Sequence, residues 1–272
     1  MRVLFLGDIL GRSGRDAVVA RLPALRTSLS LDFVVANGEN AAHGFGITAK
    51  ICGELFESGV DAITLGNHAW DQREIIGHID QEPRLLRPLN YPPGTPGRGA
   101  GIFTLARGRK ILVIQVMGRL FMDALDDPFA ALEKEFARTR LGPGGVDAII
   151  VDIHAEASSE KMSIGHFCDG RASAVFGSHT HVPTADAQIL PKGTAYQSDA
   201  GMCGDYDSVI GMQKDGAVAR YVRKMPGERL TPAEGEATVC GVIVETDDRT
   251  GLAIRVASLR QGPRLAETLP TL

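Results

Sequence analysis

Short runs of apolar, β-branched residues alternate with amphipathic segments in the first 65 residues of the chain, and this rhythm restricts the fold most. We expect strands at Val3–Leu6, Phe33–Ala36 and Asp61–Leu65. Helices are expected over Ser13–Ser28 and Thr48–Ser58, each capped by its first residue. Strands that alternate with helices in this way pair in parallel, through right-handed crossovers. The sequence therefore predicts an α/β fold.

The rest of the chain continues the pattern, and we expect residues 1–272 to form one domain. The proline-rich stretch Arg84–Arg98 is predicted to be a surface connection, and Ser208–Arg223, ambiguous between helix and strand, is taken as a helix. The other expected elements are a hairpin of Gly101–Leu105 with Lys110–Val116, a helix over Pro128–Thr139, and strands at Val146–Asp152, Ala174–Phe176, Ala187–Leu190, Thr194–Gln197, Thr238–Glu245 and Leu252–Leu259.

Composition narrows the classes of partner. The formal net charge of −4 gives no general attraction to a nucleic-acid backbone, so long nucleic acid is a poor candidate partner. No apolar run is long enough to cross a membrane, and the amino terminus resembles a strand rather than a signal peptide. The four cysteines form no CxxC pair and are typical of free thiols in a reducing compartment. We expect a cytoplasmic protein.

Polar side chains follow five of the predicted strands at the point where each strand ends. Because the carboxyl ends of parallel strands meet at one edge of a sheet, these groups should share one crevice. The strand ends are Gly7–Asp8, Asn37–Asn40, Gly66–His68, Asp152–His154 and Gly177–His181.

The chemistry of these groups predicts a metal centre. Carboxylate, amide and imidazole without thiolate suit iron or manganese, with zinc or magnesium as alternatives, and argue against Cu(I) or an iron–sulfur cluster. The candidate ligands are too many for one ion, and two ions that share a carboxylate can clamp both oxygens of an in-line phosphoryl displacement. A hydroxide that bridges the two ions would then attack phosphorus.

The same residues resemble a known superfamily. GNH at Gly66–His68, His154 after a strand, and the H-x-H of His179–His181 are similar to the motifs of calcineurin-type metallophosphoesterases. Two departures stand out: Asp8–Ile9–Leu10 replaces the usual D-x-H, and Glu39 replaces the bridging aspartate. Both departures are features of the YmdB-like subfamily. The stretches that resemble this subfamily are GDILGRSGR, NGEN, GNHAWD, MGRLFMD, VDIHAEASSEK, GSHTHVPTAD and SVIGM, between residues 7 and 212.

The resemblance implies a four-layer α/β/β/α sandwich and a phosphodiesterase that acts on 2′,3′- or 3′,5′-cyclic nucleotides. It implies that Glu39 bridges two ions. His68 is the implied general acid, with Asp71 or Asp186 as the carboxylate that orients a histidine. The implied ligands of one ion are Asp8, Glu39, Asn40 and His181, and those of the other are Glu39, Asn67, His154 and His179.

Other interpretations stay open at this point. GDILGRSG lacks the glycine spacing of a dinucleotide-binding loop, although the helix start with Arg12 remains a candidate phosphate contact and His43 a candidate substrate contact. Phe121 and Met122 suit a substrate pocket or a subunit contact in a homo-oligomer equally well. The missing first-motif histidine also suits a nucleotide- or metal-sensing regulatory protein with a slow site. A nuclease that acts on RNA ends would need a basic groove.

Overall fold

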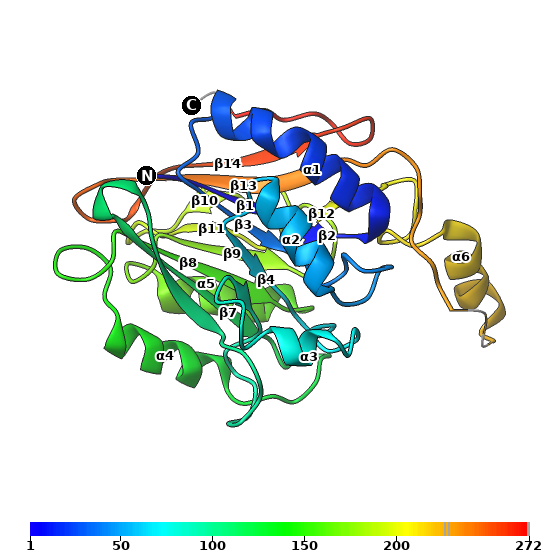
Figure 1. Ribbon diagram of the computed structural model, residues 1–272, viewed down its shortest axis with the longest axis horizontal. Helices are drawn as coiled ribbons and strands as arrows, with labels where there is room; N and C mark the ends of the chain where they lie inside the picture. Colours follow the sequence, from blue (N-terminus) through cyan, green and yellow to red (C-terminus); the bar gives the residue numbers. More distant parts are fainter. Residues whose placement is uncertain (226, 228, 271–272) are drawn as a thin grey trace.

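The protein is a sandwich of two six-stranded sheets with helices on both outer faces. The computed structural model describes residues 1–225, 227 and 229–270. Figure 1 shows α1 and α2 over one sheet and α4 and α5 over the other, which gives the four layers α/β/β/α. The helices with these roles are α1 (Gly11–Ser28), α2 (Ala49–Glu57), α4 (Pro128–Arg138) and α5 (Ser158–Cys168).

The first sheet has the strand order β14-β13-β1-β3-β4-β5. The strands β1, β3, β4 and β5 pair in parallel, as the alternation with helices predicts. Of the last two strands of the chain, β13 pairs antiparallel with β1, and β14 pairs antiparallel with β13. Their bounds are β1 (Arg2–Leu6), β3 (Phe33–Asn37), β4 (Ala62–Thr64), β5 (Leu85–Leu86), β13 (Val239–Thr246) and β14 (Ala253–Gln261).

The second sheet has the order β10-β11-β9-β8-β7-β6, and its central strands β7, β8, β9 and β11 are parallel. Its strands are β6 (Ala100–Thr104), β7 (Lys110–Met117), β8 (Ala148–His154), β9 (Ala174–Ser178), β10 (Gln188–Ile189) and β11 (Ala195–Gln197). The remaining elements are β2 (Asp8–Ile9) paired with β12 (Met202–Cys203), the short helix α3 (Ile75–His78), a 3-10 turn at Ala106–Gly108, and α6 (Lys214–Arg223).

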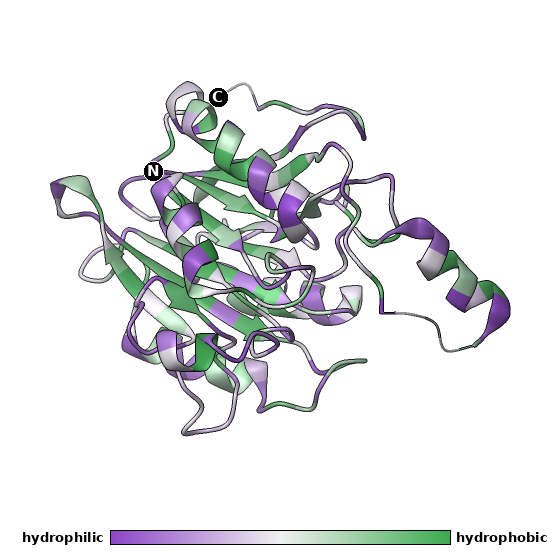
Figure 2. Ribbon diagram, turned by 45° about the vertical axis from the view of Figure 1, so that its right-hand side comes forward, coloured by the Kyte–Doolittle hydropathy of each residue, from purple (hydrophilic) through white to green (hydrophobic). Residues whose placement is uncertain are grey.

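Alternation along the strands produces separate core layers. In β1, Val3 and Phe5 belong to the core between the sheets, whereas Leu4 and Leu6 belong to the core beneath α1 and α2. The sheets meet through aromatic contacts, since the Phe5 and Phe176 ring centroids lie 5.9 Å apart. A third core packs α4 and α5 against the second sheet. In Figure 2 the strands are mainly hydrophobic, while the outer helices carry mixed colours.

The structure confirms the predicted strands and the hairpin. The majority of strand ends are shifted by one or two residues from the predicted positions. The structure also confirms the Thr48 cap, whose side chain accepts a hydrogen bond from Ile51 N. Helix α6 confirms the helical interpretation of its segment but begins only at Lys214, because residues 208–213 form turns. Figure 1 shows that α6 stands away from the body of the sandwich. Within the described residues, no helix combines the length and apolar character needed to cross a membrane.

Two sequence predictions were wrong. Ser13 does not cap α1, because the helix follows β2 directly through the extended Leu10, and the Ser13 hydroxyl instead donates to the Ala233 carbonyl. The stretch Arg84–Arg98 is not only a surface connection. It contributes the buried strand β5, and the Arg87 guanidinium is folded back onto four carbonyl groups of its own loop. Helix α5 was not predicted.

Candidate metal centre

The seven predicted ligands gather at one edge of the sandwich, where the strands of both sheets end. Asp8 opens β2 directly after β1, His154 closes β8, and the other five follow β3, β4 and β9. Asp8, Glu39 and His154 are almost fully buried. The spatial proposition of the sequence analysis, that groups far apart in the chain converge, therefore holds for these side chains.

Three of these residues surround the His154 imidazole, and together with it they form what we call the His154 group: Glu39, Asn67, His154 and His179. The Nε2 atom of His154 lies 2.9 Å from Asn67 Oδ1, 3.1 Å from Glu39 Oε1 and 3.2 Å from His179 Nδ1. Possible ligand atoms of Glu39, His154 and His179 all lie within 4.8 Å of one another. Donor atoms this close around a common point are the arrangement that holds a cation.

The remaining ligands form a second cluster, the Asp8 group: Asp8, Asn40 and His181. His181 Nε2 lies 3.3 Å from Asn40 Oδ1 and 3.9 Å from Asp8 Oδ1. Asp8 Oδ2 accepts a hydrogen bond from the backbone N–H of His179 at 3.1 Å, which ties the two groups together. Glu39 lies near both groups, and its charge therefore raises the pKa of Asp8 as well as that of His154.

The donor set fits divalent cations. Asp8 Oδ1 is buried, and no described residue gives it a hydrogen bond. A buried carboxylate oxygen without a partner is costly unless a cation compensates it. Oxygen and imidazole donors without thiolate match the ligand preference of iron, manganese or zinc.

Burial and mutual attraction shift the ionisation of these groups. Burial raises the pKa of Asp8 to about 6 against the attraction of the neighbouring histidines. Burial also opposes the charge of Glu39 and of His154, but their mutual attraction prevails: it holds the pKa of Glu39 at about 2 and raises that of His154 to about 9. Burial and the His154 charge lower the pKa of His179 to about 3. The cluster is therefore built around charge compensation.

A buried network beneath the His154 group fixes the imidazole of His154. Ser178 Oγ donates to Asp152 Oδ1 at 2.6 Å and therefore accepts from His154 Nδ1, which lies 2.9 Å away. Asp152 Oδ2 accepts further bonds from Asn37 and Gln115. This pattern keeps a proton of His154 on Nδ1 and leaves Nε2 as the candidate ligand atom.

Gly66 lets the ligands approach each other. A Cβ atom at this position would collide with Glu39 Oε2 and His154 Nε2. The backbone between β4 and Asn67 therefore forms a wall of the cluster that has no room for a side chain.

The sequence model of the YmdB-like protein family matches residues 4–259. The chain belongs to the YmdB-like family. A Bacillus subtilis protein named 2′,3′-cyclic-nucleotide 2′-phosphodiesterase is 48% identical over 256 residues, which cover 94% of this chain and 95% of that protein. A Mycoplasma genitalium protein named putative phosphatase/phosphodiesterase is 33% identical and covers 96% of this chain and 92% of its own length.

Solved structures agree with the family. A Thermus thermophilus protein of 44% identity superposes with a TM-score of 0.90, over 97% of this chain and 100% of that one. A Mycoplasma pneumoniae protein described as a novel phosphatase superposes with a TM-score of 0.89 at 33% identity, over 96% of this chain and 93% of that one. The four-layer sandwich is thus the fold of the metallophosphoesterase type that the resemblance implied.

The candidate general acid of this YmdB-like chain stands beside the ligands. His68 donates its backbone N–H to Glu39 Oε2 at 3.0 Å, and its Nδ1 atom lies 3.0 Å from Asp71 Oδ2. Asp186, the other carboxylate considered, accepts instead from the backbone of Ser198. Asp71 is therefore the carboxylate that orients His68. Phe45 packs edge-to-face on the His68 ring at 5.1 Å.

The two predicted substrate contacts are placed differently. Arg12 is exposed, and its guanidinium lies 3.8 Å from the Asp16 carboxylate on the same helix. The start of α1 itself is close to the site, because Gly11 N donates to the Asn40 carbonyl. His43 is exposed, with a positive φ of 54°. The structure records no contact of the Arg12 or His43 side chain with a candidate ligand among the described residues.

A buried ion pair that the sequence analysis missed supports the YmdB-like H-x-H segment. Lys161 Nζ, from α5, lies 2.7 Å from Asp199 Oδ2, and the same oxygen accepts from the backbone and the hydroxyl of Thr180. This anchor holds His179 and His181 in backbone conformations of positive φ, 100° and 65°. Asp199 follows strand β11, so the strand-end rule applied to that strand would have found it.

Arginines near the site were also missed. A pocket of about 290 Å³ opens over the ligands, and Arg220 and Arg229 line it. Its other walls are Glu39, Asn40, Phe45, His68, His179, His181, Ile210, Met212 and Leu230. Helix α6 and the residues after it carry both arginines, and nothing in the local sequence marked that segment as part of a site.

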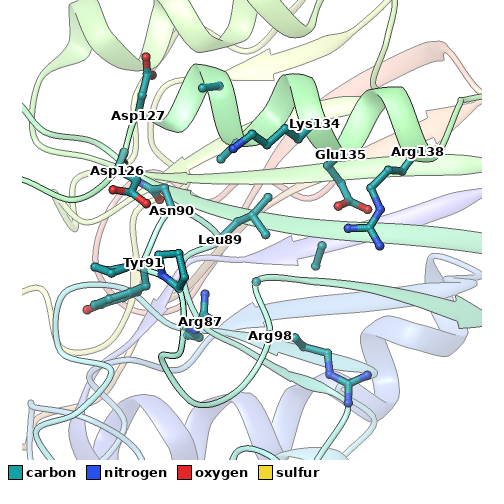
Figure 3. A pocket seen from close by; sticks show the side chains of 16 residues that line it. Arg87, Leu89, Asn90, Tyr91, Arg98, Asp126, Asp127, Lys134, Glu135 and Arg138 are labelled. Carbon is teal, nitrogen blue, oxygen red and sulfur yellow. Dashed lines mark hydrogen bonds between the residues drawn. The ribbon is translucent and has the colours of Figure 1, made fainter.

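A larger hollow lies elsewhere. It measures about 710 Å³, and Figure 3 shows it between α4, with Lys134, Glu135 and Arg138, and the proline-rich connection with Tyr91 and Arg98. None of the seven candidate ligands lines it. A search for the site by cavity volume would therefore select a hollow that contains none of the candidate ligands.

Proposed function

We propose that this chain is a dinuclear-metal phosphodiesterase that hydrolyses small phosphodiesters, with nucleoside 2′,3′-cyclic phosphates as first candidates and 3′,5′-cyclic nucleotides as second. The observation that carries the proposal is the convergence of seven metal-type ligands at one edge of the sandwich. The name of the B. subtilis relative supports the substrate class. The pocket of about 290 Å³ is near the small end of ligand pockets, about 300–1,000 Å³, which suits a nucleotide rather than a folded nucleic acid.

The two ligand groups suit two ions, for which iron or manganese is the first choice. We assign Asp8, Asn40 and His181 to one ion, Asn67, His154 and His179 to the other, and Glu39 to both. When bound, the ions would supply Lewis acidity and activate water as the nucleophile. The Asn40 amide fits its role, because its Nδ2 atom donates to the Gly44 carbonyl and leaves Oδ1 facing His181.

His68 is assigned the proton transfer. Asp71 holds its Nδ1 atom, so Nε2 is the ring nitrogen left to protonate the departing oxygen of the diester. The backbone bond from His68 to Glu39 keeps the ring beside the ligands. Phe45 packs against the ring and restricts its rotation.

Hydrolysis assays test the activity. Bis-p-nitrophenyl phosphate, 2′,3′-cyclic AMP and 3′,5′-cyclic AMP are supplied with Mn²⁺ or Fe²⁺, and a chelated sample is the control. We expect turnover that depends on metal, together with about two ions per chain in protein purified without chelator. Tight binding of nucleotide with no turnover under any metal would overturn the proposal in favour of a sensor.

The role of His68 is tested by His68→Ala. Loss of a general acid lowers turnover by about 10²–10⁴-fold, and the metal content should stay that of the parent because His68 is not assigned as a ligand. His78→Ala removes a histidine from α3 and is the matched control. Equal turnover in the two variants would refute the assignment.

A further inference from the structure

The pocket over the candidate ligands is also lined by a cationic group that the hydrolysis of one diester does not require. The Arg229 guanidinium carbon lies 4.9 Å from the centroid of the Phe45 ring, and Phe45 in turn contacts His68. Arg229, Phe45 and His68 all line the same pocket. Phe45 therefore contacts both the guanidinium and the ring of the candidate general acid.

The stacking contact determines what Arg229 can still bind. A guanidinium over an aromatic ring uses its face for the contact, while the N–H donors along its edge remain suited to an oxyanion. These donors form a fixed fork that matches two oxygens of a phosphate. Phe45 thus holds a phosphate-binding group in place before any ligand arrives, which reduces the entropy lost on binding.

The reacting diester carries a single negative charge, which the ions held by the candidate ligands would compensate; four of these ligands, Glu39, Asn40, His179 and His181, line the pocket. A second anionic group of the substrate would therefore be needed to engage Arg229. A neighbouring hollow of about 380 Å³ shares Arg220, Arg229 and Leu230 with this pocket and adds Arg223, so the cationic lining continues away from the ligands.

We propose that Arg229, held by Phe45, binds a second phosphate group, so that the preferred substrates are nucleotides that carry a phosphate in addition to the cyclic diester. This inference rests on the proposed phosphodiesterase function. It refines the substrate class from cyclic nucleotides in general to those with a further phosphate. Phosphate is the ligand, and Arg229 is a specificity-determining residue.

The test compares adenosine 2′,3′-cyclic phosphate with the same nucleotide phosphorylated at the 5′ position. A charge-assisted contact corresponds to about tenfold or more in kcat/KM, and the parent should prefer the 5′-phosphorylated substrate by that factor. Arg229→Met should bring the ratio close to one by raising KM for that substrate alone. Arg229→Lys, which keeps the charge without the fork, should fall between. Arg138→Met, an exposed arginine on α4, is the control and should keep the parental ratio.

A binding measurement does not depend on turnover. Adenosine 3′,5′-bisphosphate should bind the parent about tenfold or more tightly than adenosine 3′-monophosphate, and Arg229→Met should remove the difference. Equal affinities in the parent, or a preference that survives in Arg229→Met, would overturn the subsite. If the parent hydrolyses both cyclic substrates without preference, only this inference is refuted. If the parent hydrolyses neither substrate, the proposed function is refuted, and the binding comparison alone decides whether the subsite exists.

Discussion

The two ligand groups differ in what holds them. Beneath the His154 group lies a fully buried network in which Asp152 and Ser178 fix the His154 ring. In the Asp8 group, Asp8 opens β2, but the other two members are held by loops: the Ile210 carbonyl lies 2.8 Å from His181 Nδ1, and the Gly44 carbonyl accepts from Asn40. Buried side chains at strand ends support the His154 group, and loop carbonyls support two of the three members of the Asp8 group.

This difference indicates that the ligands of the His154 group are held in place more firmly than those of the Asp8 group. The histidine absent from the first motif belongs to the loop-held side, because Leu10 stands in its place and packs with Met202 and Met212 in a small apolar cluster. At this position the chain therefore has apolar packing in place of a histidine ligand. We expect the ion of the Asp8 group to bind more weakly than the ion of the His154 group.

Glu39→Gln should have the largest effect, because Glu39 is the residue assigned to both groups. Loss of its charge is expected to lower turnover on the order of 10³-fold and to reduce metal content at both positions. Metal analysis and hydrolysis of bis-p-nitrophenyl phosphate check this. If the metal content equalled that of the parent, the bridging assignment would be wrong.

Lys161→Met should destabilise both groups, because the Lys161–Asp199 pair anchors the segment that carries His179 and His181. Removing one partner of a buried pair costs about 3–5 kcal/mol, measured as the free energy of unfolding in urea. The control is Lys50→Met, at an exposed lysine near Glu54, which should change the free energy of unfolding by less than about 0.5 kcal/mol. A loss confined to one metal position would contradict the shared anchor.

Asp152→Asn and Asn40→Ala separate the groups. Changes at residues that orient a ligand lower metal affinity by about 10–100-fold. Asp152→Asn should therefore weaken the site of the His154 group, which is expected to bind its ion more tightly. Asn40→Ala should weaken only the other site, by a similar factor or more. Manganese titration followed by electron paramagnetic resonance resolves the two sites. The comparison fails if both variants weaken the same site.

The smallest expected effect is a pH dependence of the chelated protein. The pKa of His154 is raised from 6.5 to about 9 beside Glu39, so its contribution to stability is full below pH 6.5 and is lost as the pH rises through 9. The melting temperature of the parent should therefore fall across this interval more than that of His154→Gln. Parallel curves for the two proteins would show that His154 gains no such stabilisation.

The rule that parallel strands end at one edge predicted most of the fold and the convergence of the seven candidate ligands at that edge. It worked because strand ends are local in sequence: Asp8, Glu39 and His154 each follow an apolar run that periodicity reveals. Helix α5 escaped because its serine-rich start and weak amphipathicity give little periodic signal.

The partners that support the ligands were beyond sequence reasoning. The contacts of His181 with Ile210 and of Asn40 with Gly44 run through backbone carbonyls, which carry no residue signature. Arg229 reaches the pocket from a segment after α6, and only tertiary packing against Phe45 places it there. The choice of Asp71 over Asp186 likewise depended on distances in space.

Gly66 has a consequence for how mutants of this protein are interpreted. It contributes no functional group, yet even a methyl group there would push the Glu39 carboxylate and the His154 ring apart. An alanine scan would therefore score position 66 as if it were a ligand, although the phenotype reports volume and not chemistry. A sequence search that requires only the candidate ligands would also accept inactive homologues that carry a side chain at position 66.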